Sequence, residues 1–286
     1  MHSGSPLKNP SDDIEPDSSS REKIAGGGPA KPVTDYNRPD LTRLPHLSVW
    51  RKFFRRLINT LSLLAVRLCT RCQVNGIGNF PAHGPALLVT NHLGDADPIL
   101  AAALFPTQVE GLAKVDLVRD YPPIGWLMES YGVIWVHRGR PDRRALRAGL
   151  QALREGRIVA IAPEGRESLI GGLENGTDGA AYLAVKTGAP VVPVVFTGTE
   201  NRRIYGSLRR LHRAPVTITV GEAFNLRLPA HAENEKTKED AGGKDPSQQP
   251  GFYEKQAIRQ GTQTIMLALA RLLPPEYRGV YQKAIK

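Results

Sequence analysis

Cysteine is nearly absent from this sequence of 286 residues: only Cys69 and Cys72 occur, in the stretch CTRC. Two cysteines cannot build a disulfide framework, and no second Cys/His pair lies nearby to complete a structural zinc site. The pair ends an apolar helical stretch, whereas a thioredoxin-like motif follows a strand. We therefore interpret it as chemically inactive and expect a reducing compartment.

Long apolar runs are missing as well. No uninterrupted run reaches the roughly 18 residues that a spanning helix needs, so we expect no transmembrane helix. The opening stretch, MHSGSPLKNPSDDIEPDSSS, is polar and acidic and lacks the apolar centre of a signal peptide. The sequence also contains no Gly-x-Ser-x-Gly elbow, the turn that presents the serine nucleophile in many hydrolases.

Acidic residues are too few to balance the basic ones, and the net charge is +10. Residues 1–45 hold six Lys/Arg and seven Asp/Glu, so the remainder carries +11. A basic body predicts an anionic partner, such as phosphate groups, an acidic membrane surface or nucleic acid. Only 6% of residues are aromatic and no nucleic-acid motif occurs, so we expect no nucleic-acid partner. The basic stretch at 201–213 is instead predicted to be a loop that faces another anionic partner.

Composition divides the chain into five segments. Residues 1–45 are rich in Pro, Gly, Ser and Asp, lack apolar periodicity and are expected to be disordered. Residues 46–72 are predicted to form an amphipathic helix, and 73–230 a folded domain. The polar stretch 231–250 is expected to be a flexible linker, and the helix within 251–286 to complete the domain.

The segment 46–72 has two possible roles. Apolar residues recur at helical spacing from Trp50 to Leu68, and no acidic residue lies between Trp50 and Cys72. Such a helix either packs on its own domain or lies in a membrane interface, with arginines against anionic headgroups. The missing acids and the aromatic residues at one end favour the interface. Arg67 in the apolar half argues against a membrane span.

From residue 74 onward, short apolar segments alternate with segments of helical spacing, which is typical of an α/β fold with a largely buried sheet. The expected strands are 74–77, 86–90, 109–113, 133–136, 158–162, 191–197 and 216–220. The expected helices are 98–104, 122–131, 143–155, 179–187 and 253–273.

Ionisable residues crowd the end of one expected strand, in VTNHLGDADP. His92 lies between this strand and a helix beginning near Pro98, at the edge where α/β proteins bind ligands. Asp97 is placed to cap that helix, which would explain Asp97 without a catalytic role. A cap does not explain His92, because an imidazole oriented by a carboxylate can serve as a general base. A metal site of His92, Asp95 and Asp97 is a less favoured alternative.

Two further strands end in charged residues. In IVAIAPEGRES, Glu164, Gly165 and Arg166 follow an expected strand, and they form either a partnered buried cluster or a surface ion pair in a turn. In GVIWVHRGR, Arg138 follows another strand. It is either a solvated strand end or part of an arginine fork for phosphate.

The order of these clusters resembles the motifs of the 1-acylglycerol-3-phosphate acyltransferase family. The first motif, Asn-His, four residues and Asp, is matched by Asn91, His92 and Asp97. The remaining three motifs are matched by Gly132–Arg138, Pro163–Ser168 and Val192–Val194.

The third motif departs from the family pattern Pro-Glu-Gly-Thr-Arg-Ser. Arg166 stands in the threonine position and Glu167 in the arginine position.

The resemblance implies a glycerol-3-phosphate acyltransferase-like fold, in which a mixed central sheet is flanked by helices and residues 73–230 are the acyltransferase domain. It implies transfer of a fatty acyl group from acyl-CoA or acyl carrier protein to a hydroxyl of lysophosphatidic acid. His92 would be the base and Asp97 its partner. Arg138, Glu164, Gly165 and Arg166 would line the acceptor phosphate site.

We expect no cofactor and no metal, and the acyl thioester is expected to be a co-substrate. The protein is expected to be a peripheral membrane protein at the cytoplasmic face of the cell membrane. Two alternatives stay open: an acceptor such as another lysolipid or glycerol-3-phosphate, and a catalytically silent, membrane-attached lipid-binding protein.

Overall fold

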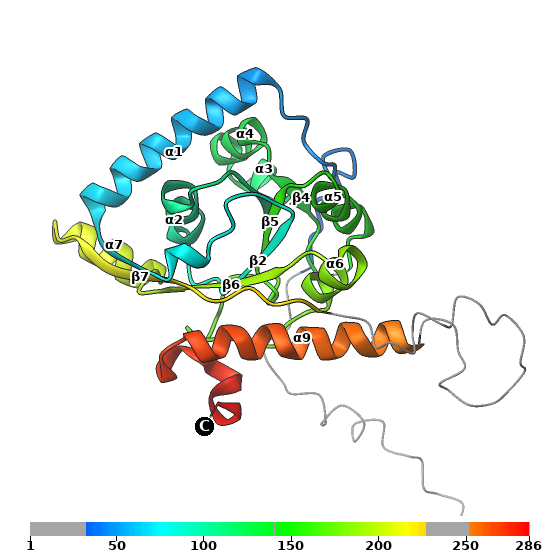
Figure 1. Cartoon of the computed structure of the whole chain (residues 1–286). Coiled ribbons are helices and arrows are strands. Elements are labelled where there is room, and N and C mark those ends of the chain that lie inside the picture. The colour runs from blue at the N-terminus through cyan, green and yellow to red at the C-terminus, as the bar shows by residue number, and fades with distance from the viewer. Residues whose placement is uncertain (1–32, 140, 227–251, 286) are drawn as a thin grey trace, which may run out of the picture. The chain divides into compact units, whose positions relative to one another are not determined.

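The computed structural model describes residues 33–139, 141–226 and 252–285, and these residues build a mixed seven-stranded sheet flanked by helices (Figure 1). The strand order is β1-β7-β6-β2-β5-β3-β4, and neighbouring strands run parallel except β6 and β7. This confirms the expected fold class. The strands are β1 (Thr70–Asn75), β2 (Ala86–Thr90), β3 (Val109–Lys114), β4 (Ile134–Val136), β5 (Ile158–Ile161), β6 (Val191–Thr197) and β7 (Ala214–Val220).

Helices cover both faces of the sheet because successive strand residues point to opposite faces. Leu87 and Val89 of β2 share a core with α5, α6 and α9, whereas Ala86 and Leu88 share a core with α1, α2 and α7. The helices are α1 (Val49–Cys69), α2 (Ala96–Leu104), α3 (Leu117–Asp120), α4 (Pro122–Tyr131), α5 (Arg143–Arg154), α6 (Gly179–Thr187), α7 (Asn201–Arg209) and α9 (Phe252–Leu272).

Several elements begin and end where the sequence predicted. Strands β2 and β6 and helices α4 and α6 have the expected bounds. Each strand is an almost continuous apolar run whose residues are buried, as expected for the centre of a parallel sheet. Each helix has a sequence signal at one end, Pro122 in the first turn of α4 and Gly188 directly after α6.

Two elements were predicted wrongly. The strand expected at 74–77 is β1, which starts at Thr70, so the predicted helix 46–72 ends at Cys69. Strand β1 lies at an edge of the sheet and has alternating burial. Its sequence TRCQVN is largely polar, so the first part of this strand was not recognised from the sequence. Residues 201–209 form helix α7 rather than a loop, because Ile204 is buried on the sheet while the arginines face outward.

The prediction that residues 1–45 are disordered is wrong for residues 33–45. These residues are ordered and contact the chain just after β4. The Thr34 N–H donates to the Arg138 carbonyl at 3.0 Å, and the Arg138 N–H donates to Thr34 Oγ1 at 2.8 Å. Thr42 is buried. These long-range contacts order a segment without apolar periodicity. Residues 1–32 and the predicted linker 231–250 lie outside the described residues.

Helix α1 is anchored by one buried arginine. Arg55 is fully buried, forms two hydrogen bonds with the Glu110 carboxylate of β3, and donates to the carbonyls of Tyr131 and Gly132. Arg51 also donates to backbone carbonyls of the domain. Two of the arginines expected to face headgroups therefore bind the protein itself.

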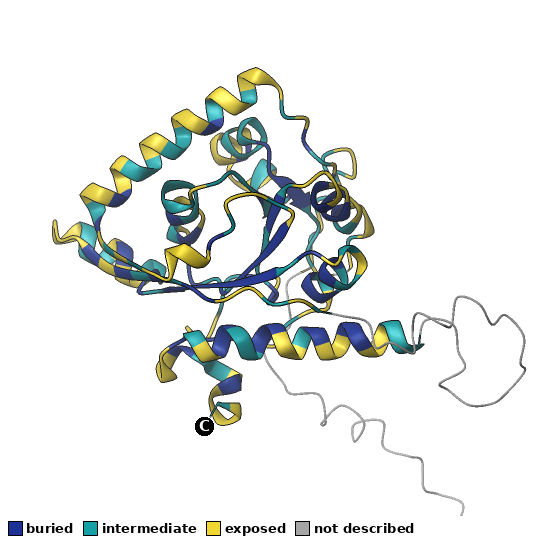
Figure 2. Cartoon of the chain, viewed as in Figure 1, coloured by how far each residue is buried: buried dark blue, intermediate teal, exposed yellow. Residues whose placement is uncertain are grey.

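Exposed residues recur along the whole length of α1 (Figure 2), and they include its apolar stripe. This exposure excludes simple packing of the stripe on the domain as the reason for its pattern. The exposed side chains are Trp50 (73% exposed), Phe53, Leu57, Leu61, Leu64 and Leu68.

Candidate active site

The candidate site lies at one edge of the sheet. Strands β6, β2, β5, β3 and β4 are mutually parallel, so their carboxyl ends meet at the same edge. The loops that follow β2, β4 and β5 carry His92, Arg138 and Glu164. The fold thus brings together motifs that are up to about seventy residues apart in the sequence.

His92 and Asp97 form a hydrogen-bonded pair. His92 Nδ1 lies 2.8 Å from Asp97 Oδ2, and the His92 side chain is 25% exposed while that of Asp97 is 6% exposed. The same carboxylate oxygen accepts the N–H groups of Leu93 at 2.7 Å and Gly94 at 3.1 Å. A carboxylate that accepts from the ring fixes the tautomer with hydrogen on Nδ1, which leaves the Nε2 lone pair available.

Asp97 does not cap helix α2 in the predicted way. The helix begins at Ala96, so Asp97 lies in its first turn and Asp95 occupies the cap position without a capping hydrogen bond from its side chain. The Asp97 carboxylate turns back toward the preceding loop instead. A simple cap therefore does not account for Asp97, whereas a role beside His92 does.

Asn91 and Gly94 hold the first-motif loop in place. Asn91 Nδ2 donates to the Phe196 carbonyl at 2.9 Å, and the Phe196 N–H donates to Asn91 Oδ1 at 2.8 Å, which ties the loop to β6. A Cβ at Gly94 would lie 2.5 Å from the carbonyl oxygen of Thr199, so only glycine fits there.

The third-motif loop packs directly beneath His92. Glu164 is 1% exposed and accepts two backbone N–H groups, that of Glu174 at 2.7 Å and that of His92. The Ser168 N–H donates to the His92 carbonyl at 2.8 Å. Burial raises the pKa of Glu164 to about 7. Glu164 thus joins the first and third motifs from the interior and does not line an open phosphate site, contrary to the prediction.

Arg166 also points into the protein. Its side chain is 5% exposed, and its Nε donates to Glu174 Oε2 at 3.1 Å while Nη2 binds the same oxygen. The predicted role in lining a phosphate site is therefore not supported by the position of this guanidinium. Gly165 is exposed at the turn, where its positive φ of 74° suits glycine.

Arg138 is the predicted phosphate ligand that remains near the surface. Its burial lowers its pKa, and the carboxylates of Asp116 and Glu167 act in the opposite direction. Among the described residues, Arg138 makes no ion pair, so its charge is available for a ligand.

Sequence reasoning missed two charged residues at this edge. Lys114 ends β3, and Glu167 lies close enough to Lys114, His92 and Asp97 for their charges to affect its pKa. The position of Lys114 at the end of a strand could have indicated it. Nothing in the sequence shows that Arg166 is buried against Glu174 whereas Glu167 stays partly exposed and accepts a hydrogen bond from Asn201.

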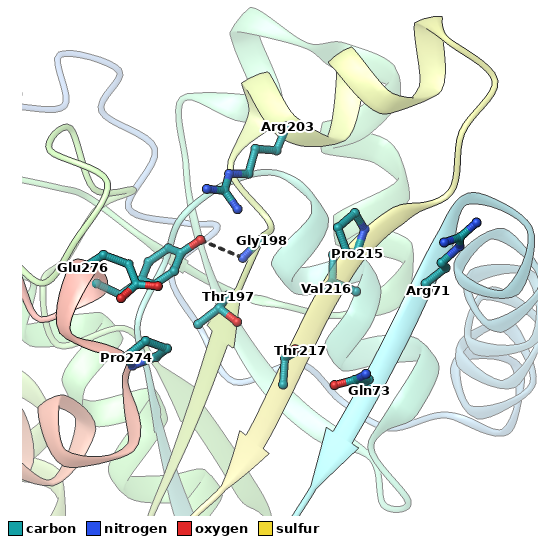
Figure 3. Close-up of a pocket in the computed structure, with 11 residues that line it drawn as sticks. Arg71, Gln73, Thr197, Gly198, Arg203, Pro215, Val216, Thr217, Pro274 and Glu276 are labelled. Atoms are coloured by element: carbon teal, nitrogen blue, oxygen red, sulfur yellow. Dashed lines mark hydrogen bonds between the residues drawn. The ribbon is translucent and has the colours of Figure 1, made fainter.

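A cavity of about 370 Å³ lies where the end of β6 meets the start of β7, and β1 and the C-terminal turn also line it (Figure 3). Tyr277 forms one wall, where its hydroxyl accepts the Gly198 N–H at 3.2 Å and donates to Glu200 Oε1 at 2.8 Å. His92 does not line this cavity. Tyr277 therefore attaches the C-terminal turn to the loop after β6, which in turn contacts the first motif.

The described ranges contain no group of three His, Cys, Asp or Glu side chains arranged to hold a metal ion. The alternative site of His92, Asp95 and Asp97 is not assembled there, because Asp95 Oδ2 accepts the Tyr205 hydroxyl at 3.0 Å. In residues 33–139, 141–226 and 252–285, every helix is too short or too polar to cross a bilayer.

Residues 71–197 match the family model described as Acyltransferase. Over these residues the chain is similar to the acyltransferase family, as its motifs predicted. The match covers β1 to β6 and therefore includes the His92–Asp97 pair and the third-motif loop.

Several curated proteins that are similar to part of this chain have more specific names. The chain is 31% identical over 153 residues to a 1-acyl-sn-glycerol-3-phosphate acyltransferase of Borreliella burgdorferi, covering 49% of this chain and 60% of the relative. It is 30% identical over 144 residues to the human 1-acyl-sn-glycerol-3-phosphate acyltransferase beta, covering 49% of this chain and 51% of the relative.

A third relative has a different acceptor in its name. The chain is 33% identical over 134 residues to a lyso-ornithine lipid O-acyltransferase of Pseudomonas aeruginosa, covering 46% of this chain and 50% of the relative. The chain thus spans 50% to 60% of the length of these three proteins. A crystal structure of the acyltransferase PlsC from Thermotoga maritima has a TM-score of 0.49 at 23% identity, covering 75% of this chain and 80% of that one.

Proposed function

We propose that this protein transfers a fatty acyl group from a thioester, acyl-CoA or acyl carrier protein, to a hydroxyl of a lysolipid of the 1-acylglycerol-3-phosphate type. One observation carries the proposal: His92 is held by Asp97 at 2.8 Å, at the carboxyl edge of a parallel sheet. Two of the relatives described above are named for transfer to 1-acyl-sn-glycerol-3-phosphate.

The chemistry requires a base but no protein nucleophile. His92 Nε2 accepts the proton of the lysolipid hydroxyl while that oxygen attacks the thioester carbonyl carbon. The C–S bond then breaks, and the imidazolium returns the proton to the departing thiolate. The Asp97 carboxylate stabilises the imidazolium and holds its ring, as the aspartate does in a serine-protease triad. No cofactor or metal takes part in this scheme.

Arg138 and Lys114 bind the anionic part of the acceptor. Lys114 is the last residue of β3 and Arg138 follows β4, at the sheet edge that holds His92. A guanidinium suits a phosphate because it can donate two parallel hydrogen bonds. Glu164, Gly165 and Arg166 act behind this surface by holding the loop that supports His92. This assignment moves Glu164 and Arg166 from direct phosphate contact to positioning.

The exposed stripe of α1 attaches the protein to the cytoplasmic face of a membrane. Its leucines and aromatic residues are exposed at helical spacing, and Lys52, Arg56 and Arg67 remain exposed near them. Phe54 stacks edge-on against Trp126 of α4, which is 67% exposed, so apolar surface continues onto α4. A lysolipid can then reach His92 from the bilayer without crossing water.

The test is an acyl-transfer assay with purified protein, acyl-CoA and lysophosphatidic acid, with products identified by mass spectrometry. We expect the wild type to form phosphatidic acid and His92→Ala to lose activity by about 10²-fold or more, because a general base contributes about that much. His83→Ala removes an exposed imidazole in the loop before β2 and serves as the matched control.

Two outcomes would contradict the proposal. Near-normal activity of His92→Ala would refute the assignment of the base. Lipid binding by the wild type without transfer to any of a panel of lysolipids and glycerol-3-phosphate, with either donor, would favour the catalytically silent alternative. Transfer only to a lysolipid other than lysophosphatidic acid would keep the mechanism and change the acceptor, for which the relative from Pseudomonas aeruginosa offers a precedent.

A further inference from the structure

An open pocket of about 370 Å³ lies where β4 ends, apart from the His92–Asp97 pair. The ordered N-terminal segment contributes Asn37 and Pro39 to one wall, and the start of α5 forms another. Three arginines of α5 line the pocket, namely Arg143, Arg144 and Arg147. Within the described ranges, none of these three guanidinium groups makes an ion pair with a carboxylate. The pocket therefore gathers positive charge that these parts of the protein leave unneutralised.

This arrangement of arginines is unfavourable for the helix alone. Arg143 and Arg147 are four residues apart, so their like charges are neighbours on the helix surface. Arg143 and Arg144 also lie in the first turn, where the helix dipole disfavours positive charge. Arg147 Nε donates to the Arg143 carbonyl at 3.2 Å, which uses one of the five N–H groups of this guanidinium. A bound anion would relieve both repulsions and accept hydrogen bonds from the rest.

The carboxylate and the imidazole in this pocket do not compete for that anion. Asp142 accepts four N–H groups, two from His137 and two from the backbone of α5. His137 Nε2 accepts the backbone N–H of Arg38, so the ring is neutral with its hydrogen on Nδ1. The negative charge of Asp142 is thus compensated by its own loop and helix, and the three arginines set the sign of the pocket.

The separation from His92 decides which phosphate can bind here. Strands β2, β5, β3 and β4 are parallel neighbours, so β2 and β4 end at the same edge, three strand spacings or about 14 Å apart. In a 1-acylglycerol-3-phosphate, the phosphate is bound to the carbon next to the one that carries the reacting hydroxyl, so it has to lie close to His92. In acyl-CoA, the pantetheine chain separates the thioester from the phosphates, which can therefore reach the pocket.

The position and shape of the pocket favour a nucleotide over a membrane surface. Helix α5 packs on the opposite face of the sheet from α1, so its arginines lie away from the exposed apolar stripe (Figure 1). The volume is within the range of small-molecule sites. Pro39 and Pro141 offer apolar surface to a base, and Asn37 carries an amide, a group that can pair with adenine through two hydrogen bonds.

We infer that this pocket binds the nucleotide end of coenzyme A, with the phosphates on Arg143, Arg144 and Arg147. The inference rests on the proposed acyl transfer and narrows its donor to acyl-CoA. An acyl carrier protein lacks the adenosine phosphates that would occupy the pocket.

The first test measures binding without catalysis. Adenosine 3′,5′-bisphosphate, which has phosphates on the adenosine of coenzyme A but no thioester, is titrated into the purified protein in a calorimeter. The test variant replaces the three pocket arginines: Arg143→Gln/Arg144→Gln/Arg147→Gln. The control variant removes the same charge from three exposed arginines outside the pocket: Arg154→Gln/Arg259→Gln/Arg271→Gln. We expect the test variant to bind at least about tenfold more weakly than the wild type and the control, because several exposed ion pairs are lost together.

The second test follows the donor in the acyl-transfer assay. With acyl-CoA, we expect the test variant to raise KM by about tenfold and to leave kcat nearly unchanged, because the phosphates lie far from the reacting atoms. With S-acyl-N-acetylcysteamine, which has the thioester and no nucleotide, the wild type and the test variant should react at the same rate.

The possible failures are distinct. No binding of adenosine 3′,5′-bisphosphate by the wild type, equal binding by the test variant, or an equal loss in the control variant would overturn the inference. Slower transfer from acyl carrier protein with unchanged transfer from acyl-CoA in the test variant would show that the arginines bind a carrier protein, and would overturn it too. A wild type that binds the bisphosphate and transfers acyl groups from neither donor would overturn the proposed function and leave the binding site.

Discussion

The variant Asp97→Asn removes the negative charge of Asp97 and keeps the shape of its side chain. In the protein, Asp97 Oδ2 accepts from His92 and from two backbone N–H groups, whereas Oδ1 is buried without a hydrogen-bond partner among the described residues. The asparagine oxygen should therefore take the Oδ2 position, because the opposite orientation would direct its NH₂ group at three donors. His92 then keeps its ring orientation and loses only the charge that stabilises the imidazolium.

The expected loss follows from that geometry. We expect kcat to fall by about 10²- to 10⁴-fold, which is about 3–5 kcal/mol of transition-state stabilisation, with little change in KM. The asparagine NH₂ group should also be left buried and unsatisfied, at a cost of about 1–3 kcal/mol in the free energy of unfolding. Thiol release from acyl-CoA measures the first quantity, and urea denaturation measures the second.

A second histidine–aspartate pair provides the control for stability. His137 Nδ1 lies 2.8 Å from Asp142 Oδ2, at the same spacing of five residues, but its Nε2 accepts the backbone N–H of Arg38. Asp142→Asn should therefore destabilise the protein and change kcat by less than about threefold. The double variant His92→Ala/Asp97→Asn should be no slower than His92→Ala, because residues that act as a unit are not additive. If Asp97→Asn keeps kcat within about threefold of the wild type, Asp97 has no role in the chemistry.

Three further predictions concern the loops and helix that support the site. Arg55→Met leaves the buried Glu110 carboxylate of β3 with only Arg157 as a weaker partner, so the free energy of unfolding should fall by about 3–5 kcal/mol in urea denaturation. Arg56→Met changes an exposed residue of α1 and should alter this free energy by less than about 0.5 kcal/mol. Equal effects of the two variants would show that the buried ion pair does not anchor α1. Burial raises the pKa of Glu164 from 4.5 to about 7, so the folded state holds this proton more tightly than the unfolded state. Stability should therefore fall by about 3 kcal/mol as the pH rises from 4.5 through 7, relative to Glu164→Gln, and parallel pH profiles for the two proteins would contradict the assignment. Trp50→Ser/Phe53→Ser removes two exposed aromatic side chains and should weaken co-sedimentation with anionic vesicles by at least about tenfold, while unchanged sedimentation would show that α1 is not the membrane contact.

The fold was predictable where local sequence and tertiary environment agree. Strands β2 and β6 are apolar runs in the sequence and lie buried at the centre of the sheet, so pattern and burial coincide. Strand β1 is polar because it lies at an edge, and the strand between 70 and 75 becomes recognisable only through its pairing with β7. Helix α7 contains Gly206 and several arginines, and the burial of Ile204 on the sheet is what makes one side of it a packing surface.

The sequence by itself determined the motifs, their order and the alternation of strands and helices, since these depend on residues that are near one another in the chain. That sufficed to predict the fold class and the helical spacing of α1. It also led to His92 as the candidate base, which stays a prediction. Only the tertiary structure decided which charges are available at the site. Arg166 is buried against Glu174, while Arg138, Lys114 and Glu167 are not paired within the described residues, and this depends on how separate loops pack at one sheet edge. The orientation of a buried charged side chain depends on the partners that compensate the cost of its desolvation. Those partners come from other parts of the chain, so the tertiary structure decides the orientation.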